Sequence, residues 1–302
     1  MASGVSVKKR TSLAALVAGV LLLSWPACGH AGLVKPSDRL PGHGGLTYFD
    51  LMKMVVTDLV PEGTGDEGNA QRIVDYRHIE GKNAKTAPAG DVAIQSLEPL
   101  AIHAEGQSRL ILMADLGPSD EAVAEFVLLA LFDIGGKPRL LDVVEVGTDR
   151  LTGFAEKPLL PLGHRSDLIH IDSDHFNSDE DFVNTELIFV RDDRFHLIDA
   201  IYTYNVKSCT YQLTEWPAVK TAADRGRRYR RIVLTVPEKV MLQPDADCGD
   251  EKAPRPFVRT FRATYRWNAR RRAFVTASGN LGKLAKENGK LNSAEPKLPS
   301  AH

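Results

Sequence analysis

Hydrophobic and polar residues alternate along much of residues 92–276. The pattern is clearest over residues 257–267, where the apolar set is Phe257, Phe261, Ala263, Tyr265 and Trp267. Successive side chains of a β-strand point to opposite faces, so a period of two places one set in a core and the other in solvent. This part of the chain is therefore predicted to form strands with one buried face.

Three segments have the order strand, tight turn, strand. Their turns lie at residues 133–136, 192–193 and 268–271, and β-branched and aromatic residues flank each turn. Asp, Asn and Gly tolerate the backbone angles of such turns. Further strands are predicted at residues 108–115 and 229–236. Strands in series with no regular helix between them predict an all-β, mainly antiparallel fold: a sandwich, a barrel or a propeller-like arrangement.

One N-terminal helix is predicted over residues 46–59, because apolar residues recur there at helical spacing and Pro61 would end it. Residues 32–45 are rich in Gly and Pro and are interpreted as a linker. Residues 279–302 hold few large apolar side chains and are predicted to be a disordered tail. A single β-rich globular domain is thus expected over residues 46–278.

The first 31 residues have the features of a secretory signal peptide. A basic cluster at residues 8–10 precedes an apolar run at 13–25, and small residues lead to Ala31. We expect cleavage after Ala31, a periplasmic or secreted protein, and no transmembrane segment in the mature chain. Cys28 could serve as a lipoprotein attachment site, but Trp25, Pro26 and Ala27 before it do not fit the usual pattern. Cys209 and Cys248 then remain, and an even count in an exported chain predicts a disulfide, with two buried thiols as the alternative.

The segment 170–182, HIDSDHFNSDEDF, concentrates acidic and histidine side chains. A strand over residues 168–174 would place His170, Asp172 and Asp174 on one face, and His175 and Asp179 follow in the connection. These five residues are the candidate metal ligands. Calcium is the candidate ion because it prefers oxygen ligands, although the spacing does not match an EF-hand loop.

Other interpretations of this segment remain open. Its first six residues resemble the HxHxDH motif of metallo-β-lactamase-like zinc hydrolases, but Asp172 replaces the second His and suitable downstream ligands are lacking. Paired carboxylates can also hydrolyse glycosides without a metal. The simplest alternative is a polar connection between two strands, because Asn, Ser and Asp bond to nearby backbone groups in turns.

Charge is unevenly distributed along the chain. Residues 32–204 contain 30 acidic and 15 basic side chains, whereas residues 205–302 contain 9 and 20. The two halves could neutralise each other, or the basic half could bind an anionic partner. The candidate anion-binding residues are Arg227, Arg228, Arg230, Arg231, Arg270, Arg271 and Arg272. An anionic envelope component or another envelope protein is the expected partner; no nucleic-acid motif is present.

Two hypotheses of function follow. The chain lacks a GxSxG elbow, a P-loop and a GxGxxG motif, which favours a non-catalytic binding or assembly module of the cell envelope. The alternative is a metal-dependent (calcium or zinc) hydrolase or other enzyme with its site around residues 170–181. Several aromatic residues either line a sugar-binding surface or belong to the sheet core: Tyr202, Tyr204, Tyr211, Trp216 and Trp267.

Overall fold

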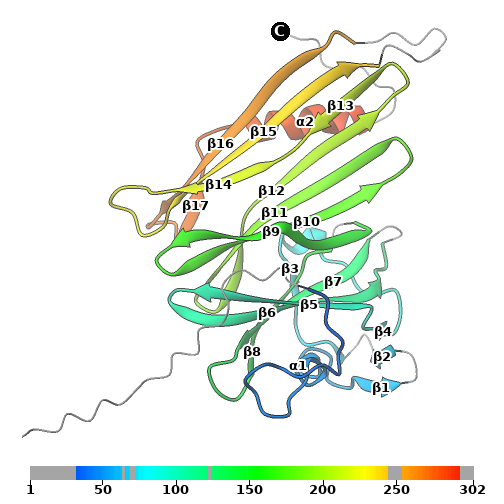
Figure 1. Cartoon of the computed structure of the whole chain (residues 1–302), viewed down its shortest axis with the longest axis vertical. Helices are drawn as coiled ribbons and strands as arrows, with labels where there is room; N and C mark the ends of the chain where they lie inside the picture. Colours follow the sequence, from blue (N-terminus) through cyan, green and yellow to red (C-terminus); the bar gives the residue numbers. More distant parts are fainter. Residues whose placement is uncertain are drawn as a thin grey trace, which may run out of the picture.

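The computed structural model describes residues 32–62, 65–68, 72–121, 124–147, 149–243 and 254–292. The chain is mainly antiparallel β structure, arranged in three sheets (Figure 1). The predicted all-β class is confirmed. The predicted signal peptide, Cys28 and Cys248 lie outside the described residues, so cleavage, lipidation and the Cys209–Cys248 disulfide stay predictions.

A five-stranded sheet has the strand order β3-β8-β7-β6-β5. Its strands are β3 (Arg77–His78), β5 (Ser96–Ala104), β6 (Gln107–Pro118), β7 (Glu125–Asp133) and β8 (Arg139–Glu145). Only the short β3 pairs in parallel. A small sheet beside it contains β1 (Val60–Glu62), β2 (Gly65–Gly68) and β4 (Val92–Ala93).

The nine-stranded sheet has the path β17-β16-β15-β13-β12-β11-β10-β9, with β14 paired to β15. Its strands are β9 (Leu151–Gly163), β10 (Ser166–Phe176), β11 (Glu180–Arg191), β12 (Arg194–Lys207), β13 (Tyr211–Glu215), β14 (Ala218–Ala222), β15 (Arg231–Leu242), β16 (Phe257–Asn268) and β17 (Ala273–Val275). The three predicted hairpins correspond to β7–β8, β11–β12 and β16–β17.

The two large sheets pack against each other through one shared apolar core. Ile111 and Met113 of β6 contribute from one side, and Ile169, Ile171 and Ile188 from the other. The opposite faces of β6 and β11 are apolar as well, because Leu110 and Leu112 pack in a second core and Leu187 and Phe189 in a third. Hydrogen bonds also join the sheets: His103 N donates to Asp167 Oδ2 at 2.7 Å, and Phe195 N donates to Asp142 Oδ2 at 2.9 Å.

The N-terminal helix predicted over residues 46–59 is not confirmed at that length. Only α1 (Tyr48–Met52) is helical, and it begins at a capping box between Thr47 and Asp50. Residues 53–59 form turns. Several of their backbone hydrogen bonds join residues only three apart in the sequence, such as Leu59 N to Val56 O. Their apolar side chains are buried, so helical spacing correctly identified the buried positions but not the backbone that carries them.

The linker and tail predictions also need correction. In residues 32–45, Leu40 is buried in the core and Val34 pairs with Leu97, so this segment packs on the domain. In the predicted disordered tail, residues 280–292 form α2 (Asn280–Asn292). Leu281 and Leu284 lie three residues apart on one face of α2 and join the core of the nine-stranded sheet. These two leucines attach α2 to the sheet, because the sheet provides the other apolar side chains of the contact.

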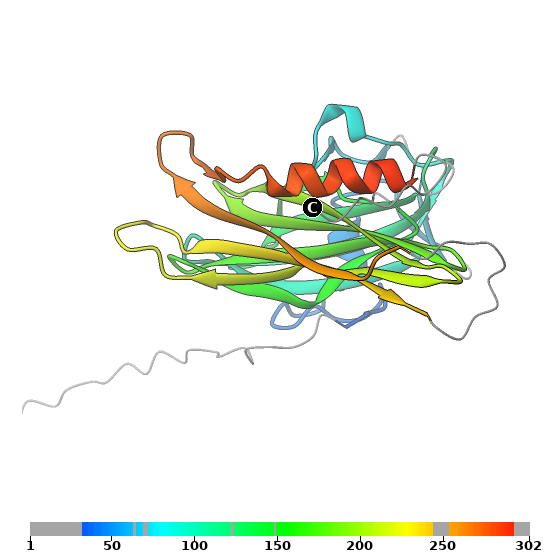
Figure 2. The ribbon, with the colours of Figure 1, turned by 90° about the horizontal axis from the view of Figure 1, so that it is seen from above.

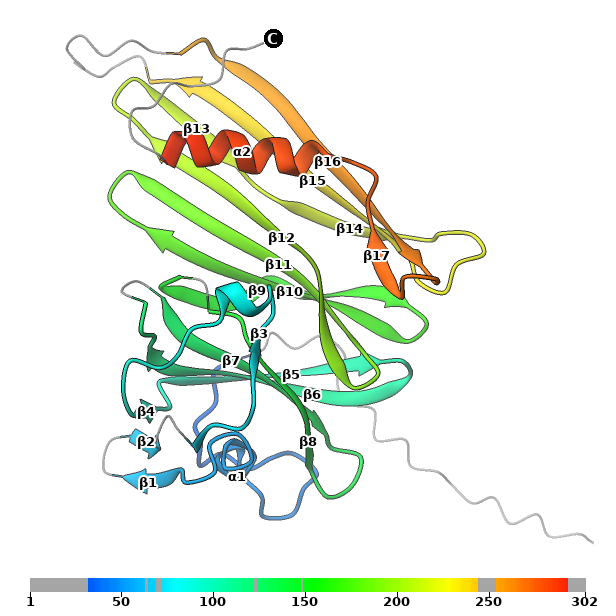
Figure 3. The same cartoon turned by 180° about the vertical axis from the view of Figure 1, so that it is seen from behind.

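Helix α2 lies across one face of the nine-stranded sheet, in contact with β12 and β16 (Figure 2). The short helix η2 (Lys82–Ala84), which follows β3, lies on the same side (Figure 3). In the described residues, no helix is both long and apolar enough to span a membrane.

Candidate functional site

Successive antiparallel strands place their connections at two opposite ends of the molecule. Five turns form what we name the arginine end: residues 105–106, 164–165, 192–193, 223–230 and 269–272. Most of them lie on the left of Figure 1. The connections at 146–150, 177–179 and 208–210 lie at the opposite end. The two sequence-predicted sites, the acidic segment and the arginine runs, therefore separate in space.

The acidic segment forms the second half of β10 and its turn into β11. The predicted strand is confirmed: Ile169, Ile171 and Ser173 are buried on one face, and His170, Asp172 and Asp174 are half-buried on the other. Residues 177–179 form the predicted polar turn. Asn177 Oδ1 accepts hydrogen bonds from the backbone of Asp179 and Glu180 at 3.3 and 3.1 Å.

The five candidate metal ligands are divided among separate contacts. His170 Nε2 lies 3.3 Å from Asp172 Oδ1, and Thr185 Oγ1 donates to the same carboxylate at 2.6 Å. His175 Nδ1 instead lies 2.8 Å from Asp149 Oδ1, a residue of the β8–β9 connection. Asp179 is exposed in the turn. In the part of the chain that is described, no three His, Cys, Asp or Glu side chains are grouped to hold a metal ion.

The carboxyl groups on this face differ in their environment. Burial acts to raise the pKa of Asp172, but the hydrogen bond and charge of His170 and the bond from Thr185 outweigh it and lower that pKa. Burial raises the pKa of Asp174, and the nearby carboxylates of Asp181, Asp149 and Asp172 add to the rise. The geometry supplies an acidic surface and no assembled calcium or zinc site, so the metal prediction gains no support.

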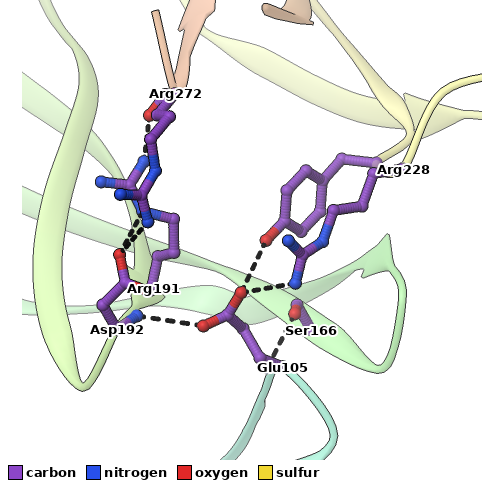
Figure 4. A network of polar contacts seen from close by, with 7 residues as sticks. Glu105, Ser166, Arg191, Asp192, Arg228 and Arg272 are labelled. Atoms are coloured by element: carbon purple, nitrogen blue, oxygen red, sulfur yellow. Dashed lines mark hydrogen bonds and ion pairs between the residues drawn. The ribbon is translucent and has the colours of Figure 1, made fainter. Parts of the chain in front are cut away.

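The arginine end is built by a polar network between turns that are far apart in the sequence (Figure 4). Arg228 Nη2 donates to Glu105 Oε1 at 2.6 Å, and Asp192 N donates to Glu105 Oε2 at 3.0 Å. Arg272 Nη2 donates to Asp192 Oδ2 at 2.5 Å, and Arg191 Nη1 donates to the carbonyl of Arg272. The network thus joins the two predicted arginine runs through one glutamate and one aspartate.

An aromatic cluster lies beneath this network. Phe189, Tyr229, Trp267 and Phe274 come from β11, the β14–β15 turn, β16 and β17, and all are buried. The ring centroids of Tyr229 and Trp267 lie 4.7 Å apart, and those of Phe189 and Phe274 lie 5.3 Å apart. Such edge-to-face pairs hold the turns in fixed relative positions. Arg227 is attached directly, because its Nη1 donates to the Trp267 carbonyl at 2.6 Å.

The acids of the arginine end are already paired. Glu105 binds Arg228, Asp193 binds Arg109, and Asp224 binds both Arg227 and Arg266. A hydrogen bond from Arg191 lowers the pKa of Asp192, and the charge of Arg272 adds to the effect. Four arginines are left exposed with no acidic partner among the described residues: Arg165, Arg225, Arg270 and Arg271.

The predicted arginines have different roles at this end. Arg270 and Arg271 point to solvent, whereas Arg227, Arg228 and Arg272 are held by the contacts above. Arg230 donates to Thr221, and Arg231 is half-buried at the start of β15. Arg165 was not predicted from the sequence. It could have been identified as a basic residue in the short turn between two strands, β9 and β10.

The turns of the arginine end also contain unusual backbone. Among the described residues, six that are not glycine have positive φ, and all six lie in four turns of this end. They are Glu105, His164, Arg165, Asp192, Asp193 and Arg272. Glycine or asparagine would adopt this conformation at lower cost. At Asp192 and Asp193 the residue type suits such a turn, whereas Glu105, His164, Arg165 and Arg272 carry a larger side chain at some cost in backbone energy.

The remaining aromatic residues are distributed as follows. Tyr211 and Trp267 belong to the core, Trp216 is exposed, and Tyr202 and Tyr204 line a cleft beside α2. Comparison of the chain with protein-family models, with curated proteins and with solved structures gave no match.

Proposed function

We propose that this protein is an exported, non-catalytic binding module of the cell envelope, and that its arginine end binds an anionic envelope component. One observation carries the proposal. Two arginine-rich runs, separated by a strand pair in the sequence, meet at one end of the fold and leave unpaired, exposed guanidinium groups there.

Guanidinium groups suit such a partner. Arginine stays charged and can bind a phosphate or carboxylate group through two parallel hydrogen bonds. The rigid aromatic cluster and the Glu105–Asp192 network hold the turns in place before binding, so little ordering is required when a partner arrives. The combined charge of several arginines attracts a polyanion over a longer distance than the charge of one arginine. Added salt screens this attraction and weakens it.

The binding role is favoured over a metal-dependent hydrolase because the five predicted ligands do not converge. His170 pairs with Asp172, and His175 pairs with Asp149. Asp174 Oδ1 has no hydrogen-bond partner among the described residues, and Asp179 lies in an exposed turn.

The charge asymmetry of the sequence supports the same conclusion in part. Acids of the first half neutralise Arg228 and Arg272, but Arg225, Arg270 and Arg271 stay exposed at the same end without an acidic partner among the described residues.

Removal of three exposed arginines should weaken binding selectively. We expect the variant Arg225→Gln, Arg270→Gln, Arg271→Gln to bind phosphatidylglycerol vesicles and the soluble polyanion dextran sulfate on the order of 100-fold more weakly at low salt. The reason is that each basic side chain near an anionic surface contributes about 1 kcal/mol. Vesicle sedimentation and isothermal titration calorimetry measure the two affinities separately, which distinguishes a lipid surface from a soluble polymer.

A matched control removes three exposed cations elsewhere: Arg39→Gln, Lys53→Gln and Lys82→Gln. It should lower the affinity about twofold or less, because only the net charge changes. Equal losses in the two variants would show that net charge, and not the arginine end, determines binding. Unchanged binding by the arginine variant would reject the proposal.

Export and the disulfide are tested by mass spectrometry. Expressed with its own N-terminus in a Gram-negative host, the protein should be recovered from the periplasm with a mass that begins at Gly32. Under denaturing conditions iodoacetamide should label no cysteine before reduction and two afterwards. A chain that retains residues 1–31, a lipid adduct on Cys28, or labelling without reduction would contradict the corresponding prediction.

A further inference from the structure

A cleft of about 310 Å³ lies between α2 and the ends of β10, β11 and β12. Its lining includes Asp149, Phe182, Tyr202 and Tyr204 from the sheet side and Asn288 and Gly289 from α2. The size is near the lower limit for small-molecule sites. The cleft lies by the β8–β9 and β10–β11 connections, at the end opposite the arginine end, so it is not part of the site proposed above.

The α2 wall presents a buried acceptor with no donor. Asn288 is 8% exposed, and its Nδ2 donates to Glu215 Oε2 at 2.7 Å and to the Tyr202 carbonyl at 3.3 Å. Those two bonds fix the orientation of the amide. The described protein groups provide no partner for Asn288 Oδ1. A buried acceptor left in this state is unfavourable unless a ligand donates to it.

The sheet side of the cleft also holds acidic groups and oxygens without a donor among the described residues. Asn184 Nδ2 and Tyr202 Oη both donate to Glu80 Oε1, at 3.0 and 2.9 Å. Glu186 projects from the same face of β11 as Asn184. It is 1% exposed, and neither of its carboxyl oxygens has a partner in the described part of the chain. Glu80 therefore places negative charge beneath the cleft, and Glu186 adds carboxyl oxygens to which no described group donates a hydrogen bond.

The rim of the cleft adds further acids. Asp149 lines it, and Tyr204 Oη donates to Glu180 Oε1 at 2.5 Å. Two basic groups act on these acids: His175 contacts Asp149, and Arg259, which acts on Glu215, is paired with Glu238 and Glu287. The cleft thus combines acceptors, negative charge and three aromatic rings.

We propose that this cleft binds a primary ammonium group on an alkyl chain, supplied either by a free amine or by a lysine side chain of a peptide. An ammonium group carries three donors and no acceptor, which matches a site whose unused atoms are acceptors. The rings of Phe182, Tyr202 and Tyr204 attract a cation through their faces and cover the alkyl chain.

Gly289 allows a direct test. Gly289 lines the cleft and a Cβ there meets no atom within 4 Å, so Gly289→Leu adds a larger side chain to the α2 wall of the cleft without a steric clash. Gly282 on the same helix is exposed and also has open space around its Cβ, and it does not line the cleft. Gly282→Leu is therefore the matched control, since both changes replace a helical glycine with a better helix former.

The binding of spermidine, of acetyl-Gly-Lys-Gly-amide and of neutral N-acetylglucosamine is measured by titration calorimetry on the mature protein. We expect spermidine or the lysine peptide to bind, Gly282→Leu to retain the affinity, and Gly289→Leu to lose it at least about tenfold. Asp149→Asn, which keeps the side-chain shape, should weaken amine binding about fivefold. The stronger of the two amine probes identifies the source of the ammonium group.

Three outcomes would overturn the proposal. The first is binding of the neutral sugar with the same affinity as the amines and no effect of Asp149→Asn. The second is an equal loss of amine binding in the two glycine variants, which would indicate attraction to the acidic surface in general. The third is no amine binding by the unmodified protein. Circular dichroism melting of each variant verifies that α2 remains folded.

Discussion

Acidification from pH 8 to 5.5 is expected to stabilise this protein against unfolding. The main cause is a set of glutamates whose burial outweighs the charge of nearby cations, Lys85 at Glu145 and Arg259 at Glu215. Glu145 and Glu215 are fully buried, and burial raises the pKa of each to about 7, against hydrogen bonds that act to lower it. Burial also raises the pKa of Glu186 well above its usual value, and Glu80 adds to the rise.

The direction follows from where the protons bind. In the unfolded chain Glu145 and Glu215 ionise near pH 4.5, whereas their folded-state pKa of about 7 lets the folded protein retain their protons to that pH. Between those values folding takes up protons, so the free energy of unfolding falls as the pH rises. Glu145 and Glu215 should each account for about 2 kcal/mol between pH 8 and 5.5.

Two histidines act in the opposite direction. Burial is the largest cause that lowers the pKa of His78 and of His196, so folding favours the neutral form of both. Their stabilising contribution is present above pH 6.5 and is lost as the pH falls, by at most about 1.4 kcal/mol each at pH 5.5. The glutamates outweigh them, and the net change remains a gain in stability.

Urea unfolding at pH 8 and 5.5 measures this change. Glu186→Gln replaces the acid with a neutral side chain of the same shape, so it should reduce the gain on acidification. Glu156→Gln, at an exposed position, should leave the gain unchanged. A free energy of unfolding that is flat or rises from pH 5.5 to 8 would show that these glutamates are not held in their protonated form.

Trp267→Ala should destabilise the protein by about 3–5 kcal/mol, the usual cost of removing a large aromatic side chain from a core. Trp267 is 6% exposed and contacts Phe189, Tyr229 and Phe274 with ring centroids 4.7 to 6.1 Å away. Because these rings hold the turns of the arginine end, polyanion binding should also fall in the variant, at temperatures where it remains folded.

The control for this change is Trp216→Ala. Trp216 lies between β13 and β14 and is 59% exposed, so its removal should cost under about 1 kcal/mol and leave polyanion binding unaltered. Chemical denaturation and vesicle sedimentation give the two quantities for both variants. Equal stability losses at the two tryptophans would mean that the aromatic cluster is not a core.

The hairpins and the polar turn could be predicted from the sequence because the signals are local. Alternation along β16, the Asp192-Asp193 turn and the turn at Asn177 each depend on residues adjacent in the chain. The length of the helix over residues 46–59 was overestimated, and α2 was not predicted, for the same reason. In each case packing on a neighbouring surface, which no local pattern contains, determined the backbone conformation.

What the sequence by itself determined is the class of the fold, the inward and outward faces of its strands, and the presence of two arginine runs and one acidic segment. Only the tertiary structure decided which of these residues meet. The runs at Arg228 and Arg272 converge through Glu105 and Asp192, while the candidate metal ligands do not converge on one point. The physical reason is that strand order, twist and register set distances between residues far apart in the chain, and alternation within one strand contains none of that information.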